Sequence, residues 1–340
     1  RSGSRQCMLI TVSFYSLRAR IMPKLSLPCH ADVVQAQQRI NSYTVKTPVL
    51  TNPALNQQLG CELFFKCENL QRTGAFKFRG ATNALLKLSP EQRQQGVITV
   101  SSGNHGAALA HAGKALGVKV KVGVPINAPA IKRQNIEAGG AETTDIEPGM
   151  AAREAIVAKW QKEGKSHFIP PYDHADIIAG QGTATLELLE QTDALDAVIT
   201  PLGGGGLLSG ACLACDGTEI QVFGAEPELA NDAFLSLKAG ERQPALPAKS
   251  LCDGLLTQIG ELPFAIIQQR ISGILVLKDE DTLSAMKLIW HHLKIIVEPS
   301  SAIALAAVIQ NKSLFEGKRV GLVLSGGNVA AQPEDIKLRQ

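Results

Sequence analysis

Residues 197–210 read AVITPLGGGGLLSG, an apolar run that leads into four consecutive glycines and then into a second apolar run. The first run favours a buried strand and the second a helix, so the glycines form the turn between them. Four glycines let the backbone fold tightly, with its N–H groups converging at a helix N-terminus whose partial positive charge favours an anion. This stretch predicts a β–α unit that binds a phosphate group.

Two other predicted strands are followed by similar loops. SSGNHG (101–106) follows the apolar run 97–100, and SGGN (325–328) follows the run 320–324. In an open α/β sheet, ligands bind outside the carboxyl ends of the strands. We therefore expect these two loops and the tetraglycine loop to face one cleft.

Short apolar runs and longer helical patterns alternate along most of the chain, which indicates an α/β fold with a mainly parallel sheet. We expect further strands at 63–66, 119–124 and 221–225, and helices at 107–116, 152–162, 183–191 and 282–293.

A lysine between two phenylalanines is the second chemical feature. Lys77 lies in TGAFKFRGA (73–81), shortly after the apolar run LFF (63–65). Partial desolvation of this lysine would favour the neutral amine, which is the form that attacks a carbonyl group. A lysine that lays its stem on apolar surface and keeps its ammonium in water is the commoner arrangement. Only partners elsewhere in the chain can decide between the two interpretations.

Composition narrows the class of protein. A chain of 340 residues with 45% hydrophobic side chains forms either one large α/β unit or two interleaved domains. The net charge of +3 is small and the basic residues are scattered, which argues against a nucleic-acid partner or a membrane surface. Since no stretch long enough to span a bilayer is free of charge, we predict no transmembrane helix.

The cysteines and the N-terminus bear on the compartment. Seven cysteines without framework spacing indicate reduced thiols in a cytoplasmic protein. The single CxxC, Cys212 and Cys215, lies in an apolar helical stretch and is expected to be a pair of buried structural thiols. The residues before Asp32 contain no acid and several arginines, as in a transit peptide or in sequence upstream of an internal start at Met22. Residues 1–21 are expected to be a disordered extension.

A nicotinamide dinucleotide site is an alternative use of the glycine loop. The next predicted strand ends near Glu226, where a Rossmann acid would hold a ribose. The fingerprint GxGxxG fits poorly, because counting from Gly203 or Gly204 places Leu208 or Ser209 at the third glycine. An oxidoreductase is therefore the weaker interpretation.

Together with FKCEN (65–69), AGQGT (179–183) and EP (298–299), these motifs resemble fold-type II pyridoxal-phosphate (PLP) enzymes, in the same order from about residue 47 to 328. Within that family they look most like serine racemases, threonine dehydratases and hydroxyaspartate ammonia-lyases. The resemblance implies two open, twisted, mainly parallel sheets flanked by helices. It also implies a large PLP-binding domain of residues 22–90 and 172–340, and a small domain of residues 91–171 that closes over the active site.

The resemblance also assigns roles to individual residues. Lys77 would attach the cofactor covalently, Gly203 to Gly206 would hold its phosphate, Asn104 would reach its hydroxyl and Ser325 would face its ring nitrogen. The residues expected to complete the cofactor site are Phe76, Leu207, Gly254 and Glu298. The residues expected to bind the substrate are Ser101, Ser102, Asn104, His105 and Arg153.

These roles imply elimination from small β-hydroxy amino acids, with L-serine, L-threonine or L-threo-3-hydroxyaspartate giving a 2-oxo acid and ammonia. Lys77 would remove the Cα proton. A hydroxyl at Ser325 cannot hold a full pyridinium, which favours elimination over transamination. Ser102 would serve the face opposite Lys77, so racemisation is possible alongside elimination, although a serine there can also simply bond locally.

The same motifs are also compatible with other activities. A serine racemase with side dehydratase activity, a β-replacement enzyme like a cysteine synthase, and a non-catalytic binding protein would all share the fold. Glu226, the carbonyl of Ala230 and Asp232 fall where the racemase binds a divalent cation, so we expect Mg²⁺, or Ca²⁺ or Mn²⁺, at that site. The resemblance also implies a homodimer, with any allosteric control acting through the cation or the dimer interface.

Overall fold

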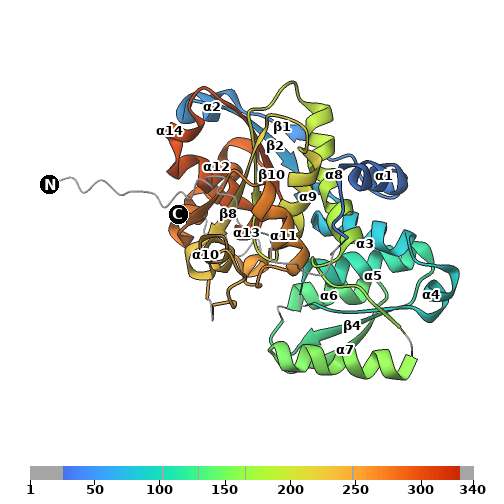
Figure 1. Cartoon of the computed structure of the whole chain (residues 1–340). Coiled ribbons are helices and arrows are strands. Elements are labelled where there is room, and N and C mark those ends of the chain that lie inside the picture. The colour runs from blue at the N-terminus through green and yellow to red at the C-terminus, as the bar shows by residue number, and fades with distance from the viewer. Residues whose placement is uncertain (1–25, 102, 129, 165, 247–248, 330–340) are drawn as a thin grey trace, which may run out of the picture.

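Two sheets divide the fold into a large and a small lobe, drawn at the upper left and the lower right of Figure 1. The computed structural model describes residues 26–329, apart from residues 102, 129, 165 and 247–248. The predicted extension of residues 1–21 and the candidate Ser102 lie outside the described residues. The strands of the small sheet all lie between residues 97 and 168, and the domain boundaries themselves stay a prediction.

The large lobe is built on a six-stranded sheet that is parallel except at one edge, where β1 pairs antiparallel with β2. Its strands in spatial order are β1 (Val49–Leu50), β2 (Glu62–Cys67), β10 (Arg319–Leu324), β7 (Ala197–Pro201), β8 (Gln221–Pro227) and β9 (Gly273–Leu277). Its helices are α1 (His30–Ile40), α2 (Pro53–Leu59), α8 (Ala175–Gln191), α9 (Gly206–Ala214), α10 (Asp232–Ala239), α11 (Glu261–Arg270), α12 (Asp279–Leu293), α13 (Pro299–Gln310) and α14 (Lys312–Phe315).

Both faces of the large sheet are covered, because side chains alternate along each strand. Ile199 of β7 packs in one cluster with Ile303 of α13. The next residue back, Val198, packs in the opposite cluster with Leu208 of α9. This burial on both sides explains why the parallel strands read as continuous apolar runs.

The small lobe has a four-stranded parallel sheet with the order β5 (Glu142–Ile146), β4 (Val120–Pro125), β3 (Val97–Val100) and β6 (His167–Phe168). Its helices are α3 (Lys77–Leu86), α4 (Pro90–Gln95), α5 (Asn104–Leu116), α6 (Ala130–Ala138) and α7 (Met150–Gly164). Phe78 and Leu85 of α3 belong to the same core as Leu109 of α5 and Val122 of β4. The helix that begins at Lys77 is therefore part of the small lobe's core, whereas the predicted domain boundary assigns it to the large domain.

Short 3₁₀ turns connect several of these elements at η1 (Glu68–Leu70), η2 (Arg72–Gly74), η3 (Glu228–Ala230) and η4 (Asp253–Leu255). Local sequence explains how neighbouring helices begin and end, and α2 is an example. The Asn52 side chain accepts a hydrogen bond from the Leu55 N–H, Pro53 occupies the first turn, and Gly60 ends the helix at φ 72°. None of the helices within the described residues is both long and apolar enough to cross a membrane.

A buried ionic network ties α3 and α8 to the large sheet. The Arg79 guanidinium bonds Glu68 through Nε at 2.7 Å and Glu187 through Nη1 and Nη2 at 2.8 Å each. The Lys66 ammonium also donates to Glu187 at 2.7 Å. The side chains of Arg79 and Glu68 are fully buried, so each charge is balanced inside the protein rather than by water.

Candidate active site

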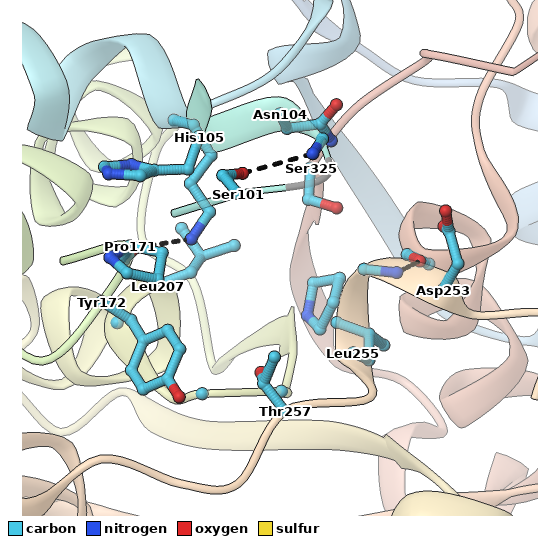
Figure 2. Close-up of a pocket in the computed structure, with 18 of the residues that line it drawn as sticks. Ser101, Asn104, His105, Pro171, Tyr172, Leu207, Asp253, Leu255, Thr257 and Ser325 are labelled. Atoms are coloured by element: carbon cyan, nitrogen blue, oxygen red, sulfur yellow. Dashed lines mark hydrogen bonds between the residues drawn. The ribbon is translucent and has the colours of Figure 1, made fainter. Parts of the chain in front are cut away.

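The three predicted loops lie at the carboxyl ends of β3, β7 and β10 and line one cavity of about 150 Å³ between the lobes. Figure 2 shows Ser101, Asn104 and Ser325 on one side of this cavity and Tyr172 and Thr257 on the other. The expectation that these loops face one cleft is therefore correct.

The glycine loop is a tight backbone cradle at the N-terminus of α9. Gly205 has φ 89°, a conformation that side-chain-bearing residues rarely adopt. A Cβ on Gly203 would come within 2.8 Å of the Leu255 backbone. The first N–H groups of α9, at Gly206 and Leu207, have no acceptor inside the helix and so suit an anion. This cradle fits a phosphate group.

Lys77 begins α3 and reaches into the same cavity. Its Nζ donates to the carbonyl of Pro171 at 2.7 Å and lies 5.1 Å from the centroid of the Phe76 ring. Burial lowers the pKa of Lys77 to about 8, although the charge of Glu298 acts in the opposite direction. Phe78, the other flanking phenylalanine, is buried in the core of the small lobe. The expected desolvation of the amine is thus present.

Asn104 and Glu298 join the loops from the two lobes. Asn104 Nδ2 donates to Glu298 Oε1 at 2.9 Å, while Asn104 Oδ1 accepts from Asn328 Nδ2 at 2.9 Å. This fixes the amide so that its second N–H remains to donate to a ligand. Burial raises the pKa of Glu298 to about 7. Glu298 Oε2 is buried without a hydrogen-bond partner among the described residues.

Ser325 follows β10 directly and is almost completely buried. Its carbonyl accepts from the Phe76 N–H at 3.0 Å, so it lies beside the segment that carries Lys77. Because the hydroxyl is neutral, it can hydrogen-bond a ring nitrogen without stabilising a full positive charge there.

In this geometry, one ring nitrogen of His105 is a hydrogen-bond acceptor. Its Nε2 lies 3.1 Å from the carbonyl of Ile169, and since a carbonyl only accepts, Nε2 carries the proton. Burial lowers the pKa of His105 to about 3, with Lys77 adding to the effect. The buried Nδ1 has no partner within the described residues and presents a lone pair. A ligand group that meets Nδ1 must bring a hydrogen, which a carboxylate lacks. The predicted contact of His105 with the substrate carboxylate therefore does not use Nδ1 in this geometry.

The remaining substrate candidates are placed as follows. Ser101 lines the cavity, and its hydroxyl accepts from the Gly103 N–H at 3.2 Å. Arg153, on α7, lines this cavity and an adjoining one of about 510 Å³. Its buried Nε lacks a hydrogen-bond partner in the described part of the chain. Gly254 lies in η4 at the cavity wall and donates its N–H to Ser300 Oγ at 3.0 Å.

Among the lining residues that were not predicted from the sequence are Lys132, Tyr172, Asp253 and Thr257. Tyr172 covers the glycine loop, with its Cβ 3.0 Å from the place of a Cβ on Gly206. Asp253 precedes the predicted Gly254, which is a partial signal, whereas Lys132 lies in a polar helix that gives none.

The candidate cation ligands lie together at the end of β8, outside this cavity. Glu226 accepts from the N–H groups of Ala233 and Phe234 at 2.9 Å each, and Asp232 accepts from the Ile259 N–H at 2.9 Å. Burial raises the pKa of Asp232 to about 6 and that of Glu226 well above its usual value. Ala230 lies between them in η3. Within the described residues, no group of three or more His, Cys, Asp and Glu could hold a metal.

The CxxC cysteines match the structural interpretation, because Cys212 and Cys215 are both buried. Burial raises the pKa of the Cys215 thiol to about 12 and raises that of Cys212 as well. Such thiols remain protonated and unreactive.

Comparison with known proteins identifies the family. The family described as "Pyridoxal-phosphate dependent enzyme" matches residues 40–326. The chain belongs to the pyridoxal-phosphate-dependent enzymes. The chain is 47% identical over 304 residues to a serine racemase of Dictyostelium discoideum, covering 88% of this chain and 94% of that protein.

Two further relatives show the range of named activities within this PLP-dependent family. An L-threo-3-hydroxyaspartate ammonia-lyase of Saccharomyces cerevisiae is 44% identical over 306 residues, covering 89% of this chain and 94% of that protein. The crystal structure of a threonine deaminase from T.th. superposes with a TM-score of 0.86 at 39% identity, covering 90% of this chain and 100% of that chain. The prediction of a fold-type II PLP enzyme is confirmed, and the dinucleotide oxidoreductase interpretation is wrong.

The cavity's residues fit the cofactor on structural grounds alone. The glycine cradle suits its phosphate, the desolvated Lys77 amine suits its aldehyde, and the Ser325 hydroxyl suits its ring nitrogen. When bound, PLP withdraws electrons from the bonds at the substrate Cα. These individual placements remain predictions from geometry and resemblance.

Proposed function

We propose that this chain is a PLP-dependent ammonia-lyase that converts small β-hydroxy amino acids to 2-oxo acids and ammonia. One observation carries the proposal: a desolvated lysine amine, with its pKa lowered to about 8, faces an anion cradle and a neutral serine hydroxyl across one cavity. The named activities of the relatives support the substrate class, since they include hydroxyaspartate ammonia-lyase, threonine deaminase and serine racemase.

The protein's own groups supply the steps. Lys77 takes the Cα proton, for which a neutral amine at a pKa near working pH is suited. Asn104, held by Glu298 and Asn328, orients the cofactor hydroxyl with its free N–H. The substrate loses the β-hydroxyl and the Cα proton as water, and the enamine released then takes up water to give the 2-oxo acid and ammonia.

Racemisation is a second candidate activity. Its support is the 47% identity to a serine racemase. It requires a proton donor on the face opposite Lys77, and Ser102 is the proposed donor. Formation of D-serine from L-serine, and its loss in Ser102→Ala with elimination retained, would support this role.

Glu226, the Ala230 carbonyl and Asp232 are the proposed ligands of a divalent cation, preferably Mg²⁺. The supporting observation is that two buried carboxyl groups of raised pKa lie together, where a hard cation would stabilise their charged forms. Metal removal with EDTA should lower oxo-acid release and thermal stability, and added Mg²⁺ should restore both. Unchanged values would contradict the site. A homodimer is also proposed, and sedimentation equilibrium tests it.

The function itself is tested by measuring oxo-acid release from L-threo-3-hydroxyaspartate, L-threonine and L-serine by the PLP-loaded enzyme. We expect release of oxo acid and ammonia in equal amounts from at least one of these substrates. If none releases ammonia, but an O-activated serine and sulfide react, the chain is a β-replacement enzyme instead.

A further inference from the structure

A buried lysine that the proposed mechanism does not use lines the active-site cavity. The Lys132 side chain, on α6 of the small lobe, is only 10% exposed. Its ammonium pairs with the carboxylate of Asp253, which lies in η4 of the large lobe. Both residues line the cavity that contains Lys77, and Figure 2 shows Asp253 at its edge.

Lys132 lies beside the predicted carboxylate site. A Cβ placed on Gly103 would be 3.2 Å from Lys132 Cδ and 3.6 Å from its Nζ. Gly103 immediately precedes α5, a 13-residue helix whose N-terminus favours negative charge. Two positive features, the helix N-terminus and the ammonium, therefore lie next to each other.

The two partners of the ion pair differ in burial. A cation as buried as Lys132 needs a counter-charge, because a charge without water or a partner is costly. The Asp253 side chain, by contrast, is 47% exposed, so it can return to water at little cost. Lys132 is therefore held in place, whereas another carboxylate can replace that of Asp253.

The charges of Lys132 and Asp253 both act on a buried carboxyl group of the active site. Lys132 lowers the pKa of Glu298 and Asp253 raises it, so both charges act on the buried carboxyl group that holds Asn104. If an incoming carboxylate replaces that of Asp253 at Lys132, the charge balance around Glu298 is preserved.

We propose that Lys132 recognises a second carboxylate on the substrate, and that Asp253 occupies Lys132 until that carboxylate arrives. This rests on the proposed function and narrows it to a preference for β-hydroxy amino acids with an acidic side chain. One carboxylate meets the N-terminus of α5 and the other meets Lys132. Arg153, on α7, lines the same cavity and also the adjoining one, so it is the alternative partner for the second carboxylate that the test must separate from Lys132.

The test uses a matched pair of unreactive probes, succinate and butyrate, which have four carbons and differ by one carboxylate. Binding of each to the PLP-loaded enzyme is measured by calorimetry in the wild type, Lys132→Met, Lys132→Arg, Asp253→Asn and Arg153→Met. Lys121→Met is the control, because Lys121 pairs with Glu142 on the small lobe with its side chain 42% exposed.

Lys132→Met should reduce the preference for succinate over butyrate at least about tenfold, the usual effect of losing a charge-assisted hydrogen bond. Lys132→Arg should retain most of the preference. Asp253→Asn should strengthen succinate binding, because the competing carboxylate is gone. The ratio of kcat/KM for L-threo-3-hydroxyaspartate over L-serine should change in the same directions.

Equal weakening of both probes in Lys132→Met would overturn the proposal and make the pair a contact that holds the lobes together. Weaker succinate binding in Asp253→Asn, or a preference lost only in Arg153→Met, would also overturn it. Because binding needs no turnover, these results are readable even if the enzyme released no oxo acid, which would refute the proposed function separately.

Discussion

Two buried polar clusters lie close together along α3, and they differ in how their hydrogen-bonding groups are satisfied. Around Arg79, the charges of Glu68, Glu187 and Lys66 all have partners within 2.8 Å. In the cavity reached by Lys77, Glu298 Oε2, His105 Nδ1 and Arg153 Nε have none among the described residues. Burial is expensive for both sets. The first cluster satisfies its own charges within the protein, whereas the second offers hydrogen-bonding groups to a ligand.

The largest expected effect is on activity. Lys77→Ala should lower kcat for oxo-acid release by about 10⁴-fold, because the cofactor attachment and the Cα base are lost together. The free energy of unfolding of the cofactor-free protein should change by less than about 1 kcal/mol, since a desolvated amine contributes little to folding. Steady-state kinetics and urea unfolding of the same preparations measure the two quantities. A variant that kept a tenth of the activity would contradict the role of Lys77.

The opposite pattern is expected further along the same helix. Arg79→Met should lower the free energy of unfolding by about 3–5 kcal/mol, because two buried carboxylates lose their guanidinium partner. Arg133→Met is the control: Arg133 bonds Asp145 at 2.7 Å near the surface, and its loss should cost about 0–1 kcal/mol. Equal losses in the two variants would show that the network does not hold the fold.

A smaller effect is expected on pH dependence. Because the pKa of Lys77 is about 8, the rate at which PLP enters the cofactor-free protein should rise with pH to a midpoint near 8. The negative charge of Glu298 raises the pKa of Lys77, so Glu298→Gln should move this midpoint to lower pH. Stopped-flow absorbance between pH values well below and well above this midpoint measures both. A wild-type midpoint at the ordinary lysine value of 10.5, or a shift to higher pH in the variant, would contradict the assignment.

The sequence predicted most parts of the fold that have strong local signals. One strand of this kind, β9, was missed, although it reads GILVL and is mostly buried. The apolar runs of β2, β3, β7, β8 and β10 are buried on both sides and were predicted within a few residues of their ends. β5, which reads ETTDI, was missed, because it is an edge strand with mostly polar side chains. β1 and β6 were missed because each has only two residues.

The site residues also divide into those that the sequence predicts and those that it does not. Gly203 to Gly206 could be predicted from a local pattern, because tight turns have recognisable sequences. Lys77 could be predicted only with the other motifs of the family, because a lysine between two phenylalanines is ambiguous by itself. Lys132 and Asp253 could not, since their pairing depends on how the two lobes meet rather than on either local sequence. His105 was predicted as a site residue, but its acceptor character follows only from the carbonyl of Ile169, 64 positions away.

The most direct test of the central claim is to reduce the PLP-loaded enzyme with borohydride, digest it and locate the modified lysine by mass spectrometry. The account predicts one phosphopyridoxyl group per chain, on the peptide that contains Lys77. A label on another lysine, or no label on a protein that binds PLP, would contradict it.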